Sequence, residues 1–391
     1  MKRRFSWIAV VAVSAALLAA ACGSDDKNSS ATTTAGSATT AAPSTGGSGA
    51  TMAPGATTTR DPNAPLDVVK ISGVARANAG NWFVVAGMNA GIMEKWGIQV
   101  DITTNPTSLA AIAALLSGAG DLAPSTFDAG LQAQLQAPDL KWVAMGYNKT
   151  PFELIVSKDI TNVEQLRGKT CGVQSLTSVD GLRVRLMLDE AAQMEYDKDY
   201  KMLVLGNATT ASRLAALESG QIQCVAMPAP DTAVLNNAGY PTLLNAADMK
   251  AFEGQPYFGY IANVDSYKDD AEKRELLERF MAALAESIVW LYDPANKTAA
   301  VETLAKEAQL DPALAESAYE WVNIGGYRPD LVTTPEELQN TVDAAKTVGV
   351  LTLFTQDPSE FIDTSLAEGG FKLLDPATQA KVEELVKKFN S

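Results

Sequence analysis

The feature that most constrains the fold is a stretch of sequence that occurs twice. The segment AALLSGAGDLAPS begins at Ala113, and a similar segment, AALESGQIQCVAMP, begins at Ala215. Each reads as the end of an apolar helix, a Ser-Gly stop, a short polar turn and a few strand residues. Gly118 and Gly220 stand where a helix commonly ends on a left-handed residue. The repetition therefore predicts equivalent helix-to-strand connections in two similarly built α/β lobes.

The rest of the chain supports this organisation, because short apolar runs alternate with segments of helical periodicity. Such alternation predicts βαβ units around largely parallel sheets. Strands are expected at 68–75, 98–105, 121–125, 140–148, 152–158, 200–207, 223–228, 241–245 and 255–265, and helices at 81–97, 108–118, 126–136, 178–194, 209–220 and 231–239. The segments 271–293, 296–309, 312–322 and 334–351 are predicted to be mostly helical.

The strand expected at 255–265 reads as the return of the chain from the second lobe to the first. We therefore predict a discontinuous lobe 1 (66–152 and 259–391, which includes the C-terminal helices) and a lobe 2 (153–258). Two crossings join the lobes, and a ligand cleft is expected between them. Hinges are predicted near 150–153 and 255–259, where the crossings would absorb a rotation of one lobe against the other.

The amino terminus reads as an export signal at 1–21. Basic residues at positions 2–4 precede an apolar run from Trp7 to Ala21, which is shorter than the roughly 20 residues that span a bilayer. Three alanines then lead to Cys22. This arrangement resembles a bacterial lipoprotein signal, although Ala19 stands where a large aliphatic residue is usual. The prediction is lipidation of Cys22, and ordinary signal-peptidase cleavage is the alternative.

The segment 22–65 is rich in Ser, Thr, Ala, Gly and Pro and contains few bulky apolar residues. Such a sequence buries too little surface to offset the entropy lost on ordering, so it is predicted to be a disordered tether. A lipid, a tether and a globular body indicate a protein anchored at the outer face of the cytoplasmic membrane.

Composition excludes several classes of function. The 46 acidic residues outnumber the 31 Lys and Arg, which gives a formal net charge of −15 and disfavours nucleic-acid binding. The chain contains no histidine, which removes His-dependent nucleophilic triads and the commonest zinc ligand. No residue spacing indicates another catalytic acid/base pair, a metal site or a cofactor.

Two cysteines remain once Cys22 is assigned to the anchor. Cys171 and Cys224 each lie in a short apolar run. Two buried, unpaired thiols on strands are the favoured interpretation, and a disulfide is the alternative that an exported protein allows.

Ser, Thr and Asn recur where predicted strands end and helices begin, at 78–82, 106–108, 125–126, 147–148, 175–178, 207–210 and 228–231. In open α/β sheets, ligands bind beyond these strand ends. The same residue types also cap helix N-termini, so capping is the structural alternative at each position. Capping groups that face a cleft are, in addition, donors for carboxylate, sulfonate or nitrate oxygens.

The chain resembles the substrate-binding proteins of ABC importers, in the nitrate/sulfonate/taurine group that includes thiamine-precursor binders (NMT1/THI5-like, SsuA-like). The resemblance runs from about residue 68 to about residue 370 and is carried by GIMEKWGIQVDI, AALLSGAGDLAPS, ITNVEQLRGKTCGVQSLTS and LAALESGQIQCVAMPAP. It implies a type 2 periplasmic binding fold. One departure is Gln223, where the family usually has the Asp that Asp121 supplies in the first copy. That position is expected to be structural.

The resemblance and the strand-end positions together define the expected ligand site. The predicted ligand-binding residues are Asn81, Trp82, Ser125, Thr126, Tyr147, Ser175, Thr177, Ser178, Pro230 and Asp231. Some fungal relatives in the superfamily are pyrimidine synthases that consume an active-site histidine, which this chain lacks, so it is not expected to be an enzyme.

The nature of the ligand stays open at this point. Helix N-termini and nearby cations (Arg76, Lys149, Arg183) favour a small organic anion of the sulfonate, nitrate or taurine type. Aromatic residues (Trp82, Phe127, Tyr147, Tyr257, Tyr260) favour a flat heterocycle such as a thiamine pyrimidine precursor or riboflavin. The expected partners are a small solute, an ABC permease with its ATPase, and the membrane through Cys22, with the protein itself a monomer. A sensory or structural lipoprotein without a transport role is a further alternative.

Overall fold

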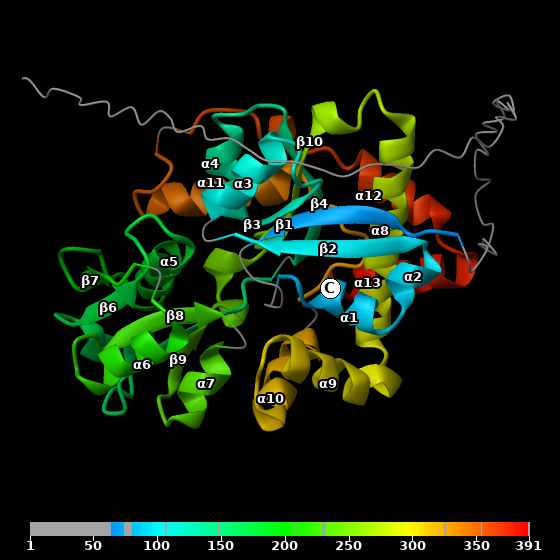
Figure 1. Ribbon diagram of the computed structural model, residues 1–391. Coiled ribbons are helices and arrows are strands. Elements are labelled where there is room, and N and C mark those ends of the chain that lie inside the picture. The colour runs from blue at the N-terminus through cyan, green and yellow to red at the C-terminus, as the bar shows by residue number, and fades with distance from the viewer. Residues whose placement is uncertain are drawn as a thin grey trace, which may run out of the picture. The chain divides into compact units, whose positions relative to one another are not determined.

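The structure is a computed structural model that describes residues 64–73, 80–105, 108–147, 149–206, 208–228, 231–323, 326–352 and 354–389 (Figure 1). The predicted signal peptide, Cys22 and the tether up to residue 63 lie outside the described residues. Among the described ranges, none of the helices combines the length and the apolar run needed to cross a membrane.

Lobe 1 begins with alternating strands and helices and is completed by a strand from much later in the chain. Its elements are β1 (Asp67–Gly73), α1 (Trp82–Asn89), α2 (Ile92–Lys95), β2 (Ile98–Thr104), α3 (Ser108–Leu116), β3 (Ala123–Thr126), α4 (Phe127–Gln134), β4 (Leu140–Tyr147) and β10 (Phe258–Asn263). The helix expected at 81–97 is broken into α1 and α2, because Gly91 adopts φ 73° between them.

Lobe 2 repeats this order of strands and helices. Its elements are β5 (Phe152–Val156), β6 (Thr170–Val173), α5 (Val179–Ala192), β7 (Lys201–Val204), α6 (Thr210–Glu218), β8 (Cys224–Pro228), α7 (Asp231–Asn237) and β9 (Thr242–Asn245). Short 3-10 turns, among them Val163–Leu166 before β6, complete the lobe.

The C-terminal part is helical, as its periodicity predicts. It consists of α8 (Ala271–Tyr292), α9 (Lys297–Glu307), α10 (Pro312–Asn323), α11 (Pro335–Thr347), α12 (Ser365–Leu373) and α13 (Pro376–Phe389). The long helix α8 buries residues at three- and four-residue spacing, including Leu277, Phe280, Leu284, Ile288 and Leu291, and packs against α1 and α12. This amphipathic stripe fixes α8 in the core of lobe 1.

The two lobes share one strand order. The strands of lobe 2 form a single sheet in the order β7-β6-β8-β5-β9. In lobe 1 the sheets β1-β2 and β3-β10-β4 are joined by a parallel bridge between Ile71 and Leu122, which gives the corresponding order β2-β1-β3-β10-β4. Strand β10 occupies in lobe 1 the place that β5 occupies in lobe 2, and these two strands carry the chain across between the lobes.

The crossing strands account for a difference from the predicted sheets, which were expected to be largely parallel. Strands β1 and β2, β6 and β7, and β6 and β8 do pair in parallel. Strand β10 is antiparallel to β3 and β4, and β5 is antiparallel to β8 and β9. A strand that returns directly from the other lobe has no crossover helix, so it enters the sheet in the opposite direction.

The repeated sequence lies at equivalent places in the two lobes, between α3 and β3 and between α6 and β8. Gly118 and Gly220 adopt φ 76° and 72°, the left-handed conformation predicted for both helix ends. The Asp121 carboxylate accepts a hydrogen bond from the Lys70 backbone N–H at 2.8 Å, and the Gln223 side-chain oxygen accepts one from the Thr170 N–H at 3.1 Å. Gln223 therefore fills the structural role of the aspartate.

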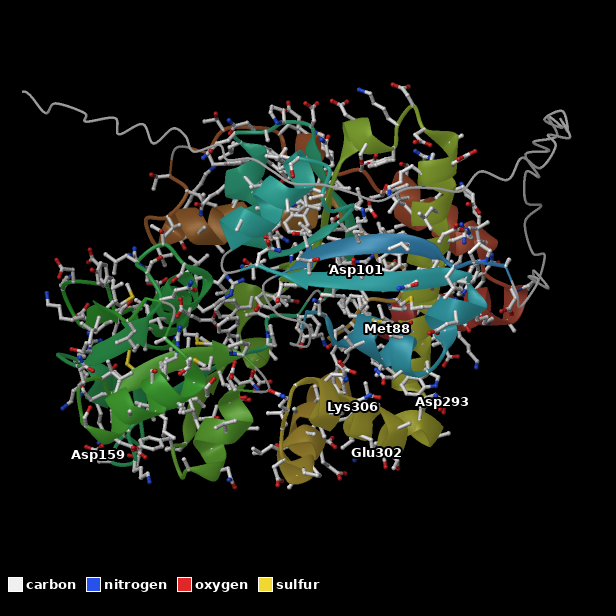
Figure 2. All side chains as sticks on the ribbon, in the orientation of Figure 1. Met88, Asp101, Asp159, Asp293, Glu302 and Lys306 are labelled. Carbon is white, nitrogen blue, oxygen red and sulfur yellow. A yellow bond between two sulfur atoms is a disulfide. The ribbon has the colours of Figure 1, made fainter. Side chains whose placement is uncertain are left out.

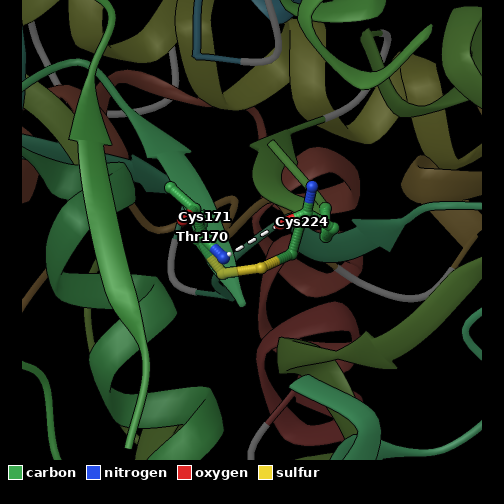
Figure 3. The surroundings of a disulfide bond; sticks show 4 residues. Thr170, Cys171 and Cys224 are labelled. Atoms are coloured by element: carbon green, nitrogen blue, oxygen red, sulfur yellow. Dashed lines mark hydrogen bonds between the residues drawn. A yellow bond between two sulfur atoms is a disulfide. The ribbon is translucent and has the colours of Figure 1, made fainter. Parts of the chain in front are cut away.

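The cysteines correct the favoured sequence interpretation of two unpaired thiols. Cys171 on β6 and Cys224 on β8 are directly paired in the parallel register, with their Cα atoms 4.4 Å apart, and they form a disulfide (Figure 3). Sequence alone did not predict the bond, because it depends on β6 and β8 being neighbours although β7 lies between them in the chain.

Candidate functional site

A cavity of about 750 Å³ lies where the two lobes and both crossings meet. Lobe 1 contributes Thr126, Ala129 and Gln132 from the region of α4, and the crossings contribute Phe152 and Tyr257. Lobe 2 contributes the largest share of the described lining, which consists of Gln174, Ser175, Thr177, Ser178, Val179, Asp180, Gly206, Ala208, Thr209, Thr210, Arg213, Ala226, Met227, Pro228 and Asp231.

The lobe 2 residues reach the cavity because β6 and β8 end there and α5, α6 and α7 begin there. This is the edge of an α/β sheet at which ligands bind. The position of the cavity follows from the chain order that the sequence predicts.

The turn before α5 presents hydroxyl groups and the N-terminus of a helix. Ser178 is the N-cap residue of α5, but its side chain makes no capping hydrogen bond to the first turn. The Ser178 hydroxyl instead accepts from the Ser175 N–H at 2.9 Å and is hydrogen-bonded to Asp180. At α6, in contrast, the Thr209 hydroxyl accepts from the Ser212 N–H at 3.2 Å. The Gly181 N–H in the first turn of α5 donates to Asp180 Oδ1 at 3.0 Å, so Asp180 rather than Ser178 caps this helix in part.

A buried ion pair stands at the same end of the cavity. Arg213 Nη1 donates to Asp180 Oδ2 at 2.9 Å, and the two side chains are 9% and 8% exposed. Asp180 Oδ2 also accepts from the Gln174 N–H at 2.8 Å. Asp180 therefore neutralises the charge of Arg213, while Arg213 Nη2 makes no hydrogen bond to any residue that the structure describes.

Asp231 is the remaining charged residue among the described lining residues. Its Oδ1 accepts a hydrogen bond from the Thr210 hydroxyl. Burial raises the pKa of the Asp231 carboxyl, although the Thr210 hydrogen bond and the charge of Arg213 act in the opposite direction. The cavity thus holds a buried carboxyl group for which one hydrogen bond, from Thr210, compensates only part of the cost of burial.

Aromatic rings from the two crossings form one apolar wall. Phe152 and Tyr257 pack edge to face with their ring centroids 5.6 Å apart, and both line the cavity. Tyr147 packs against Tyr257 at 5.8 Å from within the core. Burial raises the pKa of Tyr147 well above its usual value, so Tyr147 remains a neutral packing group at physiological pH.

Five of the predicted ligand-binding residues line the cavity: Thr126, Ser175, Thr177, Ser178 and Asp231. Ser125 lies next to the lining, is 3% exposed, and donates from its hydroxyl to the Thr126 carbonyl at 3.0 Å. Tyr147 lies one layer behind. Pro230 lies outside the described residues.

Asn81 and Trp82 are placed in the core of lobe 1 and do not line the cavity. Asn81 Oδ1 accepts from the Tyr260 hydroxyl at 2.6 Å, and Trp82 packs edge to face on Tyr319 with centroids 5.7 Å apart. Both side chains are at most 3% exposed. The first turn of α1 packs inward here, and composition alone does not separate such a turn from one that faces a cleft.

The sequence also suggested three cations and further aromatic residues as ligand contacts. Arg76 lies outside the described residues, and the others lie away from the cavity. Lys149 lies over the Phe389 ring and Arg183 over the Phe252 ring. Phe127 and Tyr260 are buried in the core.

Sequence reasoning did not single out Asp180 and Arg213, because their pairing joins the first turn of α5 to α6. Thr209 and Thr210 were among the polar strand-end positions but were not selected. No group of three or more His, Cys, Asp or Glu side chains within the described ranges is arranged to hold a metal ion.

Two α/β lobes joined by two crossings around a cavity define the fold of periplasmic binding proteins, and solved structures agree. The nitrate-binding protein NrtA from Synechocystis PCC 6803 matches with a TM-score of 0.63 and 14% identity, over 81% of this chain and 92% of its own. A ligand-binding component of an ABC-type import system from Staphylococcus aureus matches with a TM-score of 0.61 and 15% identity, over 77% and 98%. The aliphatic sulphonate binding protein SsuA from Escherichia coli matches with a TM-score of 0.56 and 18% identity, over 76% and 92%.

The sequence profile of the family described as NMT1/THI5 like matches residues 78–297. This chain belongs to the NMT1/THI5-like family. Comparison with curated protein sequences found no match.

Proposed function

We propose that this protein is an extracytoplasmic solute-binding lipoprotein that captures a small organic anion of the sulfonate, nitrate or taurine type. It delivers the solute to an ABC import permease and its ATPase. Membership of the NMT1/THI5-like family supports a role in solute binding. The names of the similar structures, a nitrate-binding and a sulphonate-binding protein, support this choice of ligand class.

The observation that carries the proposal is a set of hydrogen-bond donors gathered in one cavity. The cavity is lined by Arg213, whose Nη2 has no described partner, by the N-terminus of α5, and by hydroxyl groups that include Thr177. Guanidinium groups and helix N-termini bind oxyanions through charge-assisted hydrogen bonds. A sulfonate offers three oxygens to such donors.

Solute binding is proposed to close the lobes around the ligand. The two crossings, near 150–153 and 255–259, are the hinges, and the closed form is the one that the permease recognises. Since Phe152 and Tyr257 come from these crossings and line the cavity, a bound solute contacts the hinge directly. The solute shifts the equilibrium from the open to the closed form because it binds the closed form more tightly.

Binding without chemical conversion is part of the proposal. The chain has no histidine to serve as a general base, and the Ser178 hydroxyl is hydrogen-bonded to Asp180, which is itself paired with Arg213. The proposal extends to the amino terminus, where the sequence pattern supports export, lipidation of Cys22 and anchoring at the outer face of the membrane. We propose that the anchored protein acts as a monomer.

The second candidate ligand is a flat heterocycle. The edge-to-face pair of Phe152 and Tyr257 on the cavity wall favours it, because aromatic walls bind flat rings by stacking.

Thermal unfolding against a panel of solutes decides between the two ligand classes. The panel contains alkanesulfonates, nitrate, bicarbonate, pyrimidines, flavins and amino acids. A ligand at one hundred times its dissociation constant stabilises the folded protein by about 2.7 kcal/mol, which is a shift of about 4 °C for a body of roughly 300 residues. The proposal predicts a dose-dependent shift with sulfonates. A shift with pyrimidines or flavins alone would establish the second candidate, and an unmoved midpoint across the panel would contradict both.

A further inference from the structure

We propose that Arg185 is a latch between the lobes, which holds the turn at 175–178 in lobe 2 against α11 of lobe 1. This turn is called the cavity turn below. The latch favours the arrangement in which both lobes line the cavity. Arg185 is not among the described residues that line the cavity, so it is a positioning residue that acts through the cavity turn. The inference rests on the proposed function, because it names the residue that couples the occupied cavity to closure of the lobes.

The Arg185 guanidinium is hydrogen-bonded to both lobes at once. From its place on α5, Nη2 donates to the Leu176 carbonyl at 3.3 Å, and Nη1 donates to the Val348 carbonyl at 3.1 Å. The Arg185 Cζ atom lies 4.5 Å from the centre of the Tyr196 ring, a contact that holds the guanidinium in one orientation. A planar guanidinium presents its N–H donors in a rigid fork, so a single side chain can bind both carbonyls.

The lobe 2 end of the latch belongs to the wall of the cavity. Leu176 lies between Ser175 and Thr177, which both line the cavity. The cavity turn also packs closely on α5, because Gly181 has no side chain there: a Cβ atom at Gly181 would lie 2.6 Å from the Ser175 carbonyl oxygen. A solute that binds Ser175 or Thr177 therefore acts on the segment that Arg185 holds.

The lobe 1 end of the latch is the C-terminus of a helix. Val348 is the C-cap residue of α11, and carbonyls at this end of a helix carry partial negative charge and lack partners within the helix. Leu338 and Val342 of α11 share a buried cluster with Leu131 of α4, and α4 forms the lobe 1 wall of the cavity. Arg185 thus connects the cavity turn to the helix layer that carries the opposite wall.

The position of Val348 makes the latch sensitive to rotation of the lobes. Glu337, near the start of α11, lines a smaller cavity together with Thr150 and Gly254 at the two crossings. Val348 follows the other end of the helix, roughly 16 Å further along. A rotation of about 10° about the crossings moves a point at this distance by about 3 Å, which is enough to break a hydrogen bond. Opening of the lobes therefore costs the bond between Arg185 and Val348.

The test measures the separation of the lobes by double electron–electron resonance in the ligand-free, full-length protein. Spin labels are attached through Asp101→Cys on β2 of lobe 1 and Asp159→Cys in lobe 2, two positions that are both exposed (Figure 2). Cys22→Ser removes the competing thiol, and Cys171 and Cys224 are joined in the disulfide.

The variants are Arg185→Gln, Arg185→Lys and the control Arg167→Gln. Arg167 is a matched control because its Nη2 also donates to a backbone carbonyl, that of Ala192 at 3.0 Å, but both residues belong to lobe 2. Calorimetric titration with ethanesulfonate and urea unfolding are carried out on the same variants. Urea unfolding reports a purely structural role, whereas the label separation reports the latch.

Arg185→Gln is expected to increase the mean separation of the labels and to broaden its distribution. It is also expected to weaken the binding of ethanesulfonate about tenfold, because a hydrogen bond from a charged donor contributes about that factor. Arg185→Lys should have a smaller effect than Arg185→Gln, since an ammonium group keeps the charge but not the fork that reaches both carbonyls. Arg167→Gln is expected to change neither the separation nor the affinity.

The outcomes separate the latch from the proposed function. An unchanged label separation in Arg185→Gln overturns the latch, even where the variant unfolds at a lower urea concentration. A wider separation with undiminished affinity for ethanesulfonate overturns the coupling to the cavity. If the wild type does not bind ethanesulfonate, the proposed ligand class fails, while the label separations of the ligand-free variants still decide whether Arg185 holds the lobes together.

Discussion

Loss of the disulfide between Cys171 and Cys224 is expected to destabilise the lobe that supplies most of the cavity. The bond joins residues 53 positions apart in the sequence, and the closed loop contains α5, β7 and α6, including the paired residues Asp180 and Arg213. In the chain-entropy model, a loop of this length restricts the unfolded state by about 4 kcal/mol at 25 °C. For a body of roughly 300 residues, this corresponds to a decrease of about 6 °C in the melting temperature.

The assay compares urea unfolding of the oxidised protein with that of protein unfolded and refolded in reductant, because both cysteines are fully buried in the folded state. The double variant Cys171→Ala/Cys224→Ala is the matched control for the change of side chain. The reduced wild type and the double variant should both unfold at lower urea concentrations than the oxidised protein. If the oxidised and reduced proteins unfold at the same urea concentration, the bond does not constrain the unfolded chain and the reasoning is refuted.

Three further predictions follow from the cavity and the repeat. Arg213→Met leaves Asp180 buried without its cation, so it should lower the free energy of unfolding in urea by about 3 to 5 kcal/mol. It should also weaken anion binding measured by calorimetry. An unchanged free energy of unfolding would contradict a buried ion pair. Gly118→Ala and Gly220→Ala place a side chain at positive φ with open space around it. Each should therefore lower the free energy of unfolding in urea by about 1 kcal/mol, and unequal costs argue against equivalent roles. The raised pKa of Asp231 means that the ligand-free protein loses stability as pH rises above the pKa of an unfolded aspartate. Asp231→Asn should remove this loss in unfolding measured from pH 4 to 8, and a difference between variant and wild type that is independent of pH contradicts it.

The parts of the fold that depend on local chemistry were predictable from the sequence. The sequence located the helix ends at Gly118 and Gly220, because a Ser-Gly pair after an apolar helical segment is typical of a helix that ends on a left-handed residue. The paired roles of Asp121 and Gln223 were also expected to be structural. The direction of β5 and β10 was not predicted, since apolar periodicity identifies a strand but not the neighbour with which it pairs.

The candidate site was predictable to the extent that it follows strand ends. Ser175, Thr177 and Ser178 lie on the cavity because they form the connection between the end of β6 and the start of α5, which both lie at its edge. Asn81 occurs in an equally polar loop but is buried in lobe 1, since α1 packs against α8 there. Asp180 and Arg213 are 33 positions apart in the sequence and belong to different helices. A single sequence does not reveal which distant charged residues will pair.

The most direct test of the account is a crystal structure of the protein with the solute that gives the largest thermal shift. We predict that its oxyanion lies against Arg213 and the first turn of α5, with Thr126 of lobe 1 brought closer to the ligand. A solute bound elsewhere, with this cavity filled only by water, would contradict the account.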